Sequence, residues 1–523
     1  MQESAGQYPA WEQPVFTAGS FVYPMIRNMK SLSSCLPYKY ILKMRKKVLY
    51  MLVSIFMVVG TLSLSGESEP LAGEQQPAVQ QFGFRDTLFI PPILTADPAT
   101  GRIDLEISEG KTEFIPGVYT DTLGYNGALL GPTIVTERGE ELKFSIHNTL
   151  AEDTTVHWHG AHVPAKMDGG PFQVITAGDY WNPEFVVNQQ AATLWYHPHL
   201  MGRTAEHVYR GLAGFLVIKD AVSESLAIPQ EYGINDIPLV FQDRRFNSDG
   251  TFSYSPAMPD VMHGYFGNAM LVNGSIEPLL RVEESLVRFR ILNGSNSTIM
   301  RYRFSDGMGF YQIASDGGFL EEPVPMDKLI LSPGERAEIL VDFTQAAPED
   351  VPVLVADTSN GRQFAGVAFA LDGMRASKYH IPERLVDIPD VNIADASVRR
   401  PFVMATGMGG RMTINGRQMS MQRVDEVVQL GAVEVWEVVN AGMGMMTTPH
   451  SFHVHDIQFR VFSINGQPPL PNQRGWKDTV LLWPGDEVRL LVSFEDYTGK
   501  YMYHCHLLEH EDQGMMGVFE VVE

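Results

Sequence analysis

Hydrophobic and polar residues alternate in short runs from about Phe84 to the C-terminus, and Gly, Pro, Asn and Asp separate the runs. Residues 142–146 are typical, because Leu, Phe and Ile occupy every second position. A period of two is that of a strand with one face buried, and the breaks are typical of turns. Long segments with helical periodicity are missing from this region. The pattern therefore predicts an all-β protein.

A weak internal repeat divides this region into three. The spacing of Leu142, Phe144, Ile146 and Asn148 recurs twice further along the chain. The later copies are Val287, Phe289, Ile291 and Asn293, then Glu434, Trp436, Val438 and Asn440. A recurring strand of this kind predicts three related β-sandwich domains, which agrees with a length of about three domains of ~150 residues. Composition places these domains at residues 67–222, 223–390 and 391–523.

The first 66 residues resemble a processed leader. Residues 44–47 are basic, residues 48–59 are apolar, and small or polar residues continue to Gly66. This order is typical of a signal peptide that begins at Met44. A membrane anchor is the alternative, but the apolar stretch is shorter than the ~20 residues of a membrane span. We predict cleavage, a periplasmic or extracellular location, no membrane span after cleavage, and no role for residues 1–43.

Charge and cysteine content narrow the possible functions. The chain has a formal net charge of −23, and its first 66 residues hold seven Lys or Arg and two Asp or Glu, so the rest carries −28. Such a surface repels nucleic acid and anionic lipid, and we expect neither as a partner. Only Cys35 and Cys505 occur, and Cys35 lies in the leader, so the exported chain cannot form an internal disulfide. Metal ligation would explain a single thiol outside the cytoplasm.

A C-terminal motif provides such a metal site. Cys505, His510 and Met515 follow one another at intervals of five residues. Two His, one Cys and a weak axial Met are the ligands of a blue-copper centre, so one loop supplies three of the four. His504 and His506 flank the Cys, and in an extended segment they point to the opposite face. A second metal site is therefore expected directly behind the first.

Three further histidine motifs precede this one: His157-Trp158-His159, His197-Pro198-His199 and His450-Ser451-Phe452-His453-Val454-His455. The four motifs, in this order, resemble those of the three-domain multicopper oxidases, the group of laccases, bilirubin oxidases and bacterial copper-efflux oxidases. The resemblance runs from about residue 85 to residue 523. It implies three cupredoxin-like Greek-key β-sandwich domains, of which only the first and third carry ligands.

The resemblance also implies a role for each motif residue, with one type 1, one type 2 and two type 3 copper ions. The type 1 ion would accept single electrons from a reducing substrate, and the other three would reduce dioxygen to water. The implied ligands are His450, Cys505, His510 and Met515 for type 1; His157 and His453 for type 2; His159, His197 and His506 for one type 3 ion, and His199, His455 and His504 for the other.

Two acids stand where similar bacterial enzymes have proton-relaying carboxylates. Asp168 lies in Met-Asp-Gly-Gly, and Glu511 directly follows His510. Asp168 could instead be only a turn residue before two glycines. We predict a relay role for both, since a carboxylate near a cationic cluster can pass protons through water. Asp478 is expected to be structural.

The donor is the least defined part of the prediction. Copper-efflux oxidases carry a long methionine-rich insertion that this chain does not match, and the Met residues at 404–421 are expected to fill core gaps. Met443, Met445 and Met446 could line the electron-entry surface. We predict a phenolic, aromatic or bilirubin-type donor that reaches an exposed imidazole edge of His450. A cuprous oxidase or metallo-oxidase in copper tolerance is the alternative.

Other classes of protein fit the motifs less well. Some three-domain relatives have lost copper and act as structural or cell-division proteins, but this chain keeps all twelve ligands. An electron-transfer cupredoxin would need only the type 1 set. A copper nitrite reductase would have two domains and lack the fourfold histidine pattern.

Overall fold

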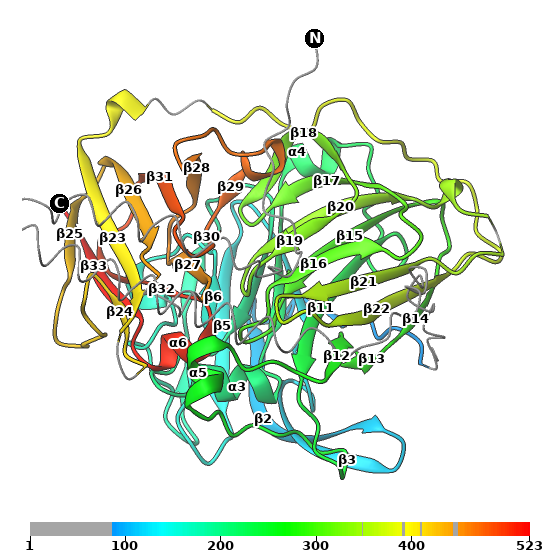
Figure 1. Cartoon of the computed structure of the whole chain (residues 1–523), viewed down its shortest axis with the longest axis horizontal. Coiled ribbons are helices and arrows are strands. Elements are labelled where there is room, and N and C mark those ends of the chain that lie inside the picture. The colour runs from blue at the N-terminus through cyan, green and yellow to red at the C-terminus, as the bar shows by residue number, and fades with distance from the viewer. Residues whose placement is uncertain (1–85, 348, 390–392, 408–409, 443–447) are drawn as a thin grey trace, which may run out of the picture. The chain divides into compact units, whose positions relative to one another are not determined.

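The computed structural model describes residues 86–347, 349–389, 393–407, 410–442 and 448–523. The predicted leader and signal peptide lie outside these residues, as do Met443, Met445 and Met446. Strands dominate the described chain, and its helices are short (Figure 1). None of the helices in the described residues is long and apolar enough to cross a membrane. The all-β prediction is confirmed.

Two sheets form from the first part of the chain. Their facing apolar side chains make one core, which includes Phe144, Trp158 and Tyr196. One sheet has the order β3 (Val118–Tyr125), β2 (Ile103–Ile115), β5 (Glu141–Asn148) and β7 (Tyr180–Trp181), with β8 (Glu184–Val186) also pairing with β5. The other has the order β1 (Ile93–Leu94), β4 (Thr133–Glu137), β10 (Gly214–Lys219), β9 (Ala192–His197) and β6 (His157–His159).

Two further sheets form from the middle of the chain, around a core that includes Phe241, Phe289 and Tyr302. The larger has the order β13 (Ser275–Ile276), β12 (Ala269–Val272), β11 (Asp236–Arg244), β15 (Leu286–Asn293), β20 (Arg336–Asp342), β17 (Phe310–Ser315) and β18 (Gly318–Met326). The smaller has the order β14 (Leu279–Arg281), β22 (Gln363–Ala370), β21 (Val353–Thr358), β16 (Met300–Phe304) and β19 (Leu329–Leu331).

The last pair of sheets, yellow to red in Figure 1, packs around a core that includes Trp436, Phe452 and Cys505. One has the order β24 (Met412–Ile414), β23 (Val398–Thr406), β26 (Val433–Asn440), β31 (Glu487–Ser493), β28 (Phe459–Ile464) and β29 (Trp476–Lys477). The other has the order β25 (Glu426–Gln429), β33 (Met516–Val522), β32 (Gly499–Cys505), β27 (His450–Val454) and β30 (Thr479–Leu482).

The three copies of the sequence repeat occupy equivalent strands, β5, β15 and β26. Each runs parallel to an earlier strand of its own sheet: β2, β11 and β23, respectively. Each copy ends in an Asn whose side-chain amide donates to two backbone carbonyls outside its own strand. The acceptors are those of Glu152 and Ile175 for Asn148, of Thr298 and Leu331 for Asn293, and of Thr448 and Leu482 for Asn440. The repeated spacing therefore places an Asn with the same pair of hydrogen bonds in all three sandwiches.

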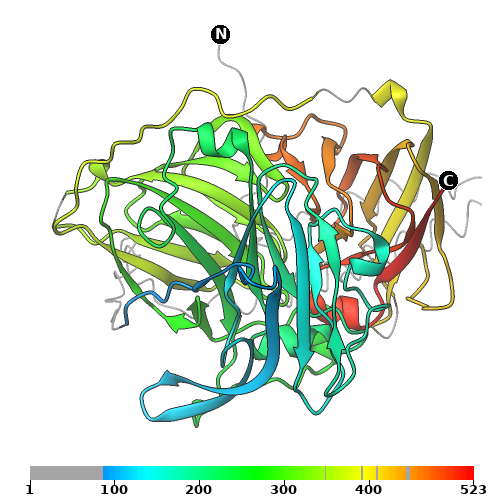
Figure 2. The same ribbon diagram turned by 180° about the vertical axis from the view of Figure 1, so that it is seen from behind.

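The predicted domain boundaries stay predictions. Residue 222 falls within the short helix α4 (Ala221–Ser225), between β10 and β11, and residue 390 lies outside the described residues. In both views the ribbon of residues 371–389 runs along the outside of the molecule (Figures 1 and 2). Four 3-10 turns complete the described elements: η1 (Ala165–Met167), η2 (Phe343–Gln345), η3 (Ile393–Asp395) and η4 (Pro471–Gln473).

Three helices from different parts of the chain meet near one end of the last sheets. Helix α6 (Leu508–Asp512) contacts both α3 (Thr204–Arg210) and α5 (Met258–His263), as Figure 1 shows. The Asp512 carboxylate accepts the backbone N–H groups of Thr204 and Ala205 at 3.1 and 3.0 Å. These N–H groups belong to the first turn of α3 and lack partners within that helix. Asp512 thus fixes α6, the helix that carries His510 and Glu511.

Candidate metal centres

His450, Cys505 and His510 form a buried group, which we call the mononuclear group. His450 begins β27, Cys505 ends the neighbouring strand β32, and His510 lies on α6. The Cys505 Sγ lies 3.6 Å from His450 Nδ1 and 3.7 Å from His510 Nδ1, and the two Nδ1 atoms are 3.2 Å apart. Burial raises the pKa of the Cys505 thiol to about 12. A bound cation would stabilise the thiolate at this site, so the donor set fits a soft metal ion.

Met515 lies next to this group. Its backbone carbonyl accepts from Cys505 N–H at 3.0 Å, and its own N–H donates to the His510 carbonyl at 3.0 Å. The side chain is fully buried in the same core as Cys505. These backbone hydrogen bonds therefore bring Met515 beside Cys505 and His510.

A second group of imidazoles, the polynuclear group, lies behind Cys505. Its first three members, His199, His455 and His504, converge through their Nε2 atoms. The His504 Nε2 lies 3.1 Å from that of His199 and 3.2 Å from that of His455. Three nitrogen atoms at this spacing fit around one cation.

Carboxylates face the outer nitrogens of these three rings. The Asp168 Oδ2 accepts from His455 Nδ1 at 2.9 Å. The Glu511 oxygens approach His504 Nδ1 at 3.2 Å and His199 Nδ1 at 3.5 Å, without hydrogen-bond geometry. Both acids are buried, and burial raises the pKa of each. The His504 Nδ1 donates to the Cys505 carbonyl at 3.1 Å. These acceptors on the outer nitrogens of His455 and His504 fix the tautomer that leaves Nε2 free for a metal.

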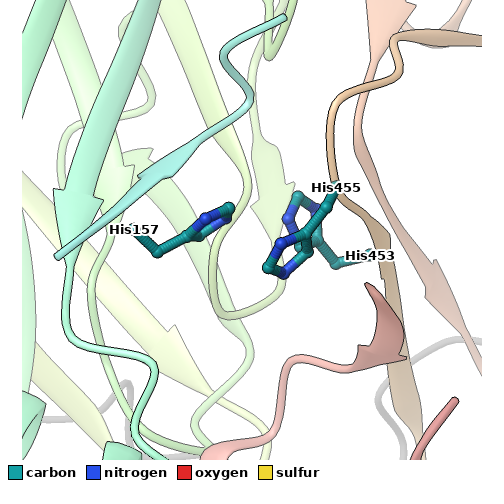
Figure 3. Close-up of side chains that lie close together, drawn as sticks. All are labelled: His157, His453 and His455. Carbon is teal, nitrogen blue, oxygen red and sulfur yellow. The ribbon is translucent and has the colours of Figure 1, made fainter. Parts of the chain in front are cut away.

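His157 and His453 face the centre of the group from opposite sides (Figure 3). The Nδ1 of His157 donates to the Asp168 carbonyl at 2.9 Å, and that of His453 to the Asp478 carbonyl at 2.8 Å. Their Nε2 atoms are buried and have no hydrogen-bond partner among the described residues. An orphaned imidazole nitrogen in a protein interior is costly, and a metal ion would satisfy it.

His159 and His197 belong to the polynuclear group, and His506 packs beside them. The His159 Nδ1 lies 3.3 Å from His197 Nε2, whereas His159 Nε2 donates to Asp478 Oδ1 at 3.0 Å. The His506 ring centroid is 4.8 Å from that of His159 and 5.3 Å from that of His197. Metal-ligand spacing links His157 with His159 and His197, but it does not include His506. The division of these ligands among individual ions therefore stays a prediction.

Five imidazoles in or beside the polynuclear group have pKa values shifted in favour of the neutral ring. For His157, His197, His455, His504 and His506, burial is the main cause of a pKa well below the ordinary value, and neighbouring imidazoles lower it further. Neutral rings keep a lone pair for a cation. The residues therefore fit a multinuclear metal cluster. The first and the last sandwich each supply only some of its ligands.

Comparison with known proteins agrees with this geometry. Family models described as multicopper oxidase match residues 106–223 and 391–523. Multicopper oxidase mco of Staphylococcus haemolyticus is 39% identical over 417 residues, which cover 80% of this chain and 88% of that protein. The chain belongs to the multicopper oxidase family. The predicted family and its cupredoxin fold are confirmed, and with them an oxidoreductase that uses copper, dioxygen and a reducing substrate.

Relatives of this multicopper oxidase have more than one described role. A solved laccase-like multicopper oxidase CueO from Ochrobactrum sp. is described as having oxidase activity towards lignin model compounds and lignosulfonate. It shares 38% identity with a TM-score of 0.77, covering 83% of this chain and all of that one. Cell division protein FtsP of Photorhabdus laumondii is 34% identical over 455 residues, which cover 82% of this chain and 90% of that protein.

The structure corrects one sequence expectation and enlarges another. The imidazole edge of His450 is not at the surface, since His450 is 1% exposed and His510 is fully buried. Helix α5 packs there, and Val261 and Met262 rest on the core that contains Cys505. Asp478, expected to be structural, also accepts a hydrogen bond from His159. Its Lys-Asp-Thr context has no feature from which that contact could be predicted.

Proposed function

We propose that this multicopper oxidase binds four copper ions and couples one-electron oxidation of a small reducing substrate to four-electron reduction of dioxygen to water. The observation that supports this most directly is the segment His504-Cys505-His506. Cys505 belongs to the mononuclear group, His504 belongs to the polynuclear group, and His506 packs beside the polynuclear group. Peptide bonds alone therefore connect the two groups, which suits electron transfer from one to the other.

The proposed ligands are those that the sequence motifs suggested. His450, Cys505, His510 and Met515 hold the type 1 ion, and the polynuclear group holds the type 2 and the two type 3 ions. Copper there supplies the redox chemistry, namely single-electron acceptance at one end and dioxygen reduction at the other. The protein keeps both groups buried, which excludes bulk water and restricts the loss of partly reduced oxygen species.

Asp168 and Glu511 are the proposed proton relays. Asp168 Oδ2 is bonded to His455, while its Oδ1 has no hydrogen-bond partner among the described residues. Glu511 lies between His199 and His504, with both oxygens buried. Asp168 can therefore orient His455 and still accept or release a proton at Oδ1, and both Glu511 oxygens can accept a proton.

The proposed donor is a phenol or another aromatic compound of modest size. His450 and His510 are buried, so a donor cannot touch either imidazole directly. It must instead bind at the surface near α5 and transfer its electron through the residues that cover these rings. The Thr448 hydroxyl holds that helix in place by donating to the Met262 carbonyl at 2.9 Å. The negative formal charge of the chain should favour neutral or cationic donors at low salt.

A metal-ion donor is the second candidate, because of two thioethers on the same helix. Met258 is 54% exposed, and Met262 is partly buried against the core of the last pair of sheets. Soft thioethers bind Cu(I). Oxygen uptake with a phenol, bilirubin and Cu(I) in parallel distinguishes the candidates. If a Met258→Leu, Met262→Leu variant loses Cu(I) oxidation but keeps phenol oxidation, α5 carries a metal-ion site. Met201→Leu is the control, because Met201 is 40% exposed and is not part of α5.

Metal analysis and electron paramagnetic resonance test the proposed function as a whole. The purified full chain should be blue, show both type 1 and type 2 signals, and consume dioxygen without releasing peroxide. A copper-free protein after loading with Cu²⁺ would instead support a role like that of the FtsP relatives. Export to the periplasm or beyond is part of the proposal, and N-terminal sequencing of the secreted protein tests it.

A further inference from the structure

The middle sheets carry none of the predicted ligands, yet one of their turns contacts the strand β27 and the surroundings of the polynuclear group. This turn, residues 332–336, joins β19 to β20, and we call it the junction turn. The Ser332 hydroxyl lies 2.8 Å from that of Ser451, and the Ser451 hydroxyl donates to the Pro333 carbonyl at 3.1 Å. The carbonyl of Ser451 accepts the backbone N–H of His506 at 2.6 Å. The junction turn is therefore bonded to the strand that runs from His450 to His453.

Arg336, the last residue of the turn, bonds to all three pairs of sheets. Its side chain donates to the Thr193 carbonyl of the first sheets at 3.0 Å and to the Asp316 carbonyl of the middle sheets at 2.9 Å. Toward the last sheets it forms a fork with Asp478, at 2.7 Å to Oδ1 and 2.6 Å to Oδ2. Both side chains are fully buried, so this pair is desolvated and geometrically fixed.

Asp478 extends this arrangement to two ligands of the polynuclear group. Its Oδ1 accepts from His159 Nε2 at 3.0 Å, and its backbone carbonyl accepts from His453 Nδ1 at 2.8 Å. The two-point fork with the Arg336 guanidinium supplies a donor to each oxygen of Asp478, the geometry of an ionised carboxylate. An ionised carboxylate only accepts hydrogen bonds, so the proton of His159 is placed on Nε2. Its Nδ1 lone pair is then directed at the interior, next to His197.

Gly334 fixes a third ligand by close packing. Its φ of +85° suits glycine, and a Cβ at this position would lie 2.9 Å from His506 Cγ and 3.0 Å from Cδ2 and Nδ1. Both nitrogens of His506 lack hydrogen-bond partners among the described residues. The orientation of this ring therefore depends on what it packs against, and the bare backbone of Gly334 is one such surface, together with the Trp195 ring at 5.6 Å between centroids.

We propose that the junction turn is a positioning element of the polynuclear site: Arg336 acts through Asp478 on His159, and Gly334 acts directly on His506. The inference rests on the proposed function, because it concerns the ligands of the proposed cluster. It gives the ligand-free middle sandwich a specific task, which is to hold ligands from the other two sandwiches in register. Altering the turn should weaken metal binding at the polynuclear group and spare the mononuclear group, whose ligand atoms the turn does not touch.

Gly334→Ala is the sharpest test, with Gly307→Ala as its matched control. Gly307 has a similar φ of +82° in the middle sheets, but a Cβ there would meet nothing within 4 Å. Both variants impose the same backbone strain, and only Gly334→Ala displaces His506. We expect roughly 10–100-fold weaker binding of at least one polynuclear copper in Gly334→Ala, as for other changes next to metal ligands. The readouts are copper per chain against a competing chelator and the type 1 and type 2 resonance signals.

Arg336→Met tests the second contact, with Arg290→Met as control. Arg290 is also buried and ion-paired, to Asp236 and Glu338, and contacts Thr193, but it bonds to no predicted ligand. The positioning role of Arg336 is supported if both variants lose a similar amount of stability but only Arg336→Met loses copper. Arg336→Lys, which keeps the charge but not the fork, should recover part of the copper and of the type 2 signal.

The outcomes separate this inference from the proposed function. If wild-type protein binds no copper at the polynuclear group, the proposed function fails. If wild-type protein binds it and Gly334→Ala retains copper and resonance signals equal to those of Gly307→Ala, the positioning role of Gly334 is wrong. Equal copper retention in the Arg336→Met and Arg290→Met variants would overturn the role of Arg336 in the same way, leaving the turn purely structural.

Discussion

The mononuclear and polynuclear groups differ in how much of the molecule they require. His450, Cys505 and His510 all come from the last sandwich and its helix α6. The polynuclear group draws on β6 and the end of β9 in the first sandwich, and on β27 and β32 in the last. Asp168 and Glu511 approach its outer nitrogens. The middle sandwich contacts it through Gly334, which packs on His506, and through Arg336, which is bonded to Asp478 of the last sandwich. One site is local, whereas the other depends on the junction of three sandwiches.

This difference has a consequence for assembly. A site within one sandwich can form whenever that sandwich folds, but a shared site forms only after the junctions close. Residues that hydrogen-bond to metal ligands orient those ligands. Changing such residues therefore weakens metal binding even when the ligands themselves are unchanged. Changes at the junctions should therefore deplete the polynuclear group first, and changes within the last core should deplete the mononuclear group first.

Cys505→Ser should separate the two groups most completely. A buried hydroxyl replaces the sulfur ligand of the mononuclear group, so we expect the blue absorption to vanish and the type 1 ion to be lost. The polynuclear imidazoles are untouched and should keep about three ions. Copper analysis with absorption spectroscopy decides this. A variant that loses all copper would mean that the polynuclear group also depends on the Cys505 side chain, against the comparison.

Asp168→Asn should break the polynuclear site functionally while leaving its ligands in place. The amide oxygen can still accept from His455, but the side chain can no longer carry a proton. General acid–base groups typically contribute about 10²–10⁴-fold in rate, so reoxidation of the reduced enzyme should slow by at least about 100-fold. Stopped-flow measurement of anaerobic reduction by the donor is the internal control and should be unchanged. Unimpaired reoxidation would leave Asp168 as an orienting residue only.

Local patterns were sufficient to predict the fold class and the ligand motifs. Alternation with period two is visible within seven residues, as in residues 142–148, and each His-x-His pair is equally local. The Asn residues at the ends of β5, β15 and β26 belong to the same repeat, and their shared bonds explain it. Such features depend on neighbours in the chain, so the sequence displays them directly.

Long-range packing was not predictable in the same way. Arg336 and Asp478 are 142 residues apart, and neither stands in a motif that indicates the other. The burial of His450 has the same origin, because α5 comes from almost 190 residues earlier in the chain. Arg336, Gly334 and Met262 acquire their roles from where other segments place them. The sequence alone therefore suggested an exposed His450 edge that the fold covers.

Met515→Leu should perturb the mononuclear group more mildly than loss of the thiolate. The side chain is buried beside Cys505, so leucine of similar volume should keep the core and the bound copper. Without the weak thioether donor, Cu(II) is less stabilised and the reduction potential should rise. Redox titration of the blue absorption measures the change. An unchanged or lowered potential would show that another group is axial.

His162 offers a pH-dependent test of the junction between the first and last sandwiches. Its Nδ1 lies 2.9 Å from Asp456 Oδ1, its Nε2 lies 3.3 Å from Asp496 Oδ2, and its ring lies 4.7 Å from that of Tyr497. Burial alone would lower the pKa of His162, but these carboxylates raise it to about 9. The folded protein thus binds this proton more tightly than the unfolded chain, whose ordinary His value is about 6.5.

The sign of the effect follows from that difference. The ion pairs stabilise the folded state fully below about pH 6.5, and this contribution is lost as pH rises through about 9; partial exposure of Asp496 limits it to about 1–3 kcal/mol. His162→Gln should therefore lower the urea midpoint at pH 6 and match the wild type near pH 10. The control His380→Gln, at an exposed position, should match the wild type at both pH values. In the wild-type holoprotein, alkaline pH should release polynuclear copper before the blue absorption fades. Loss of the blue absorption first, or equal pH profiles for His162→Gln and wild type, would show that closing this junction does not control the shared site.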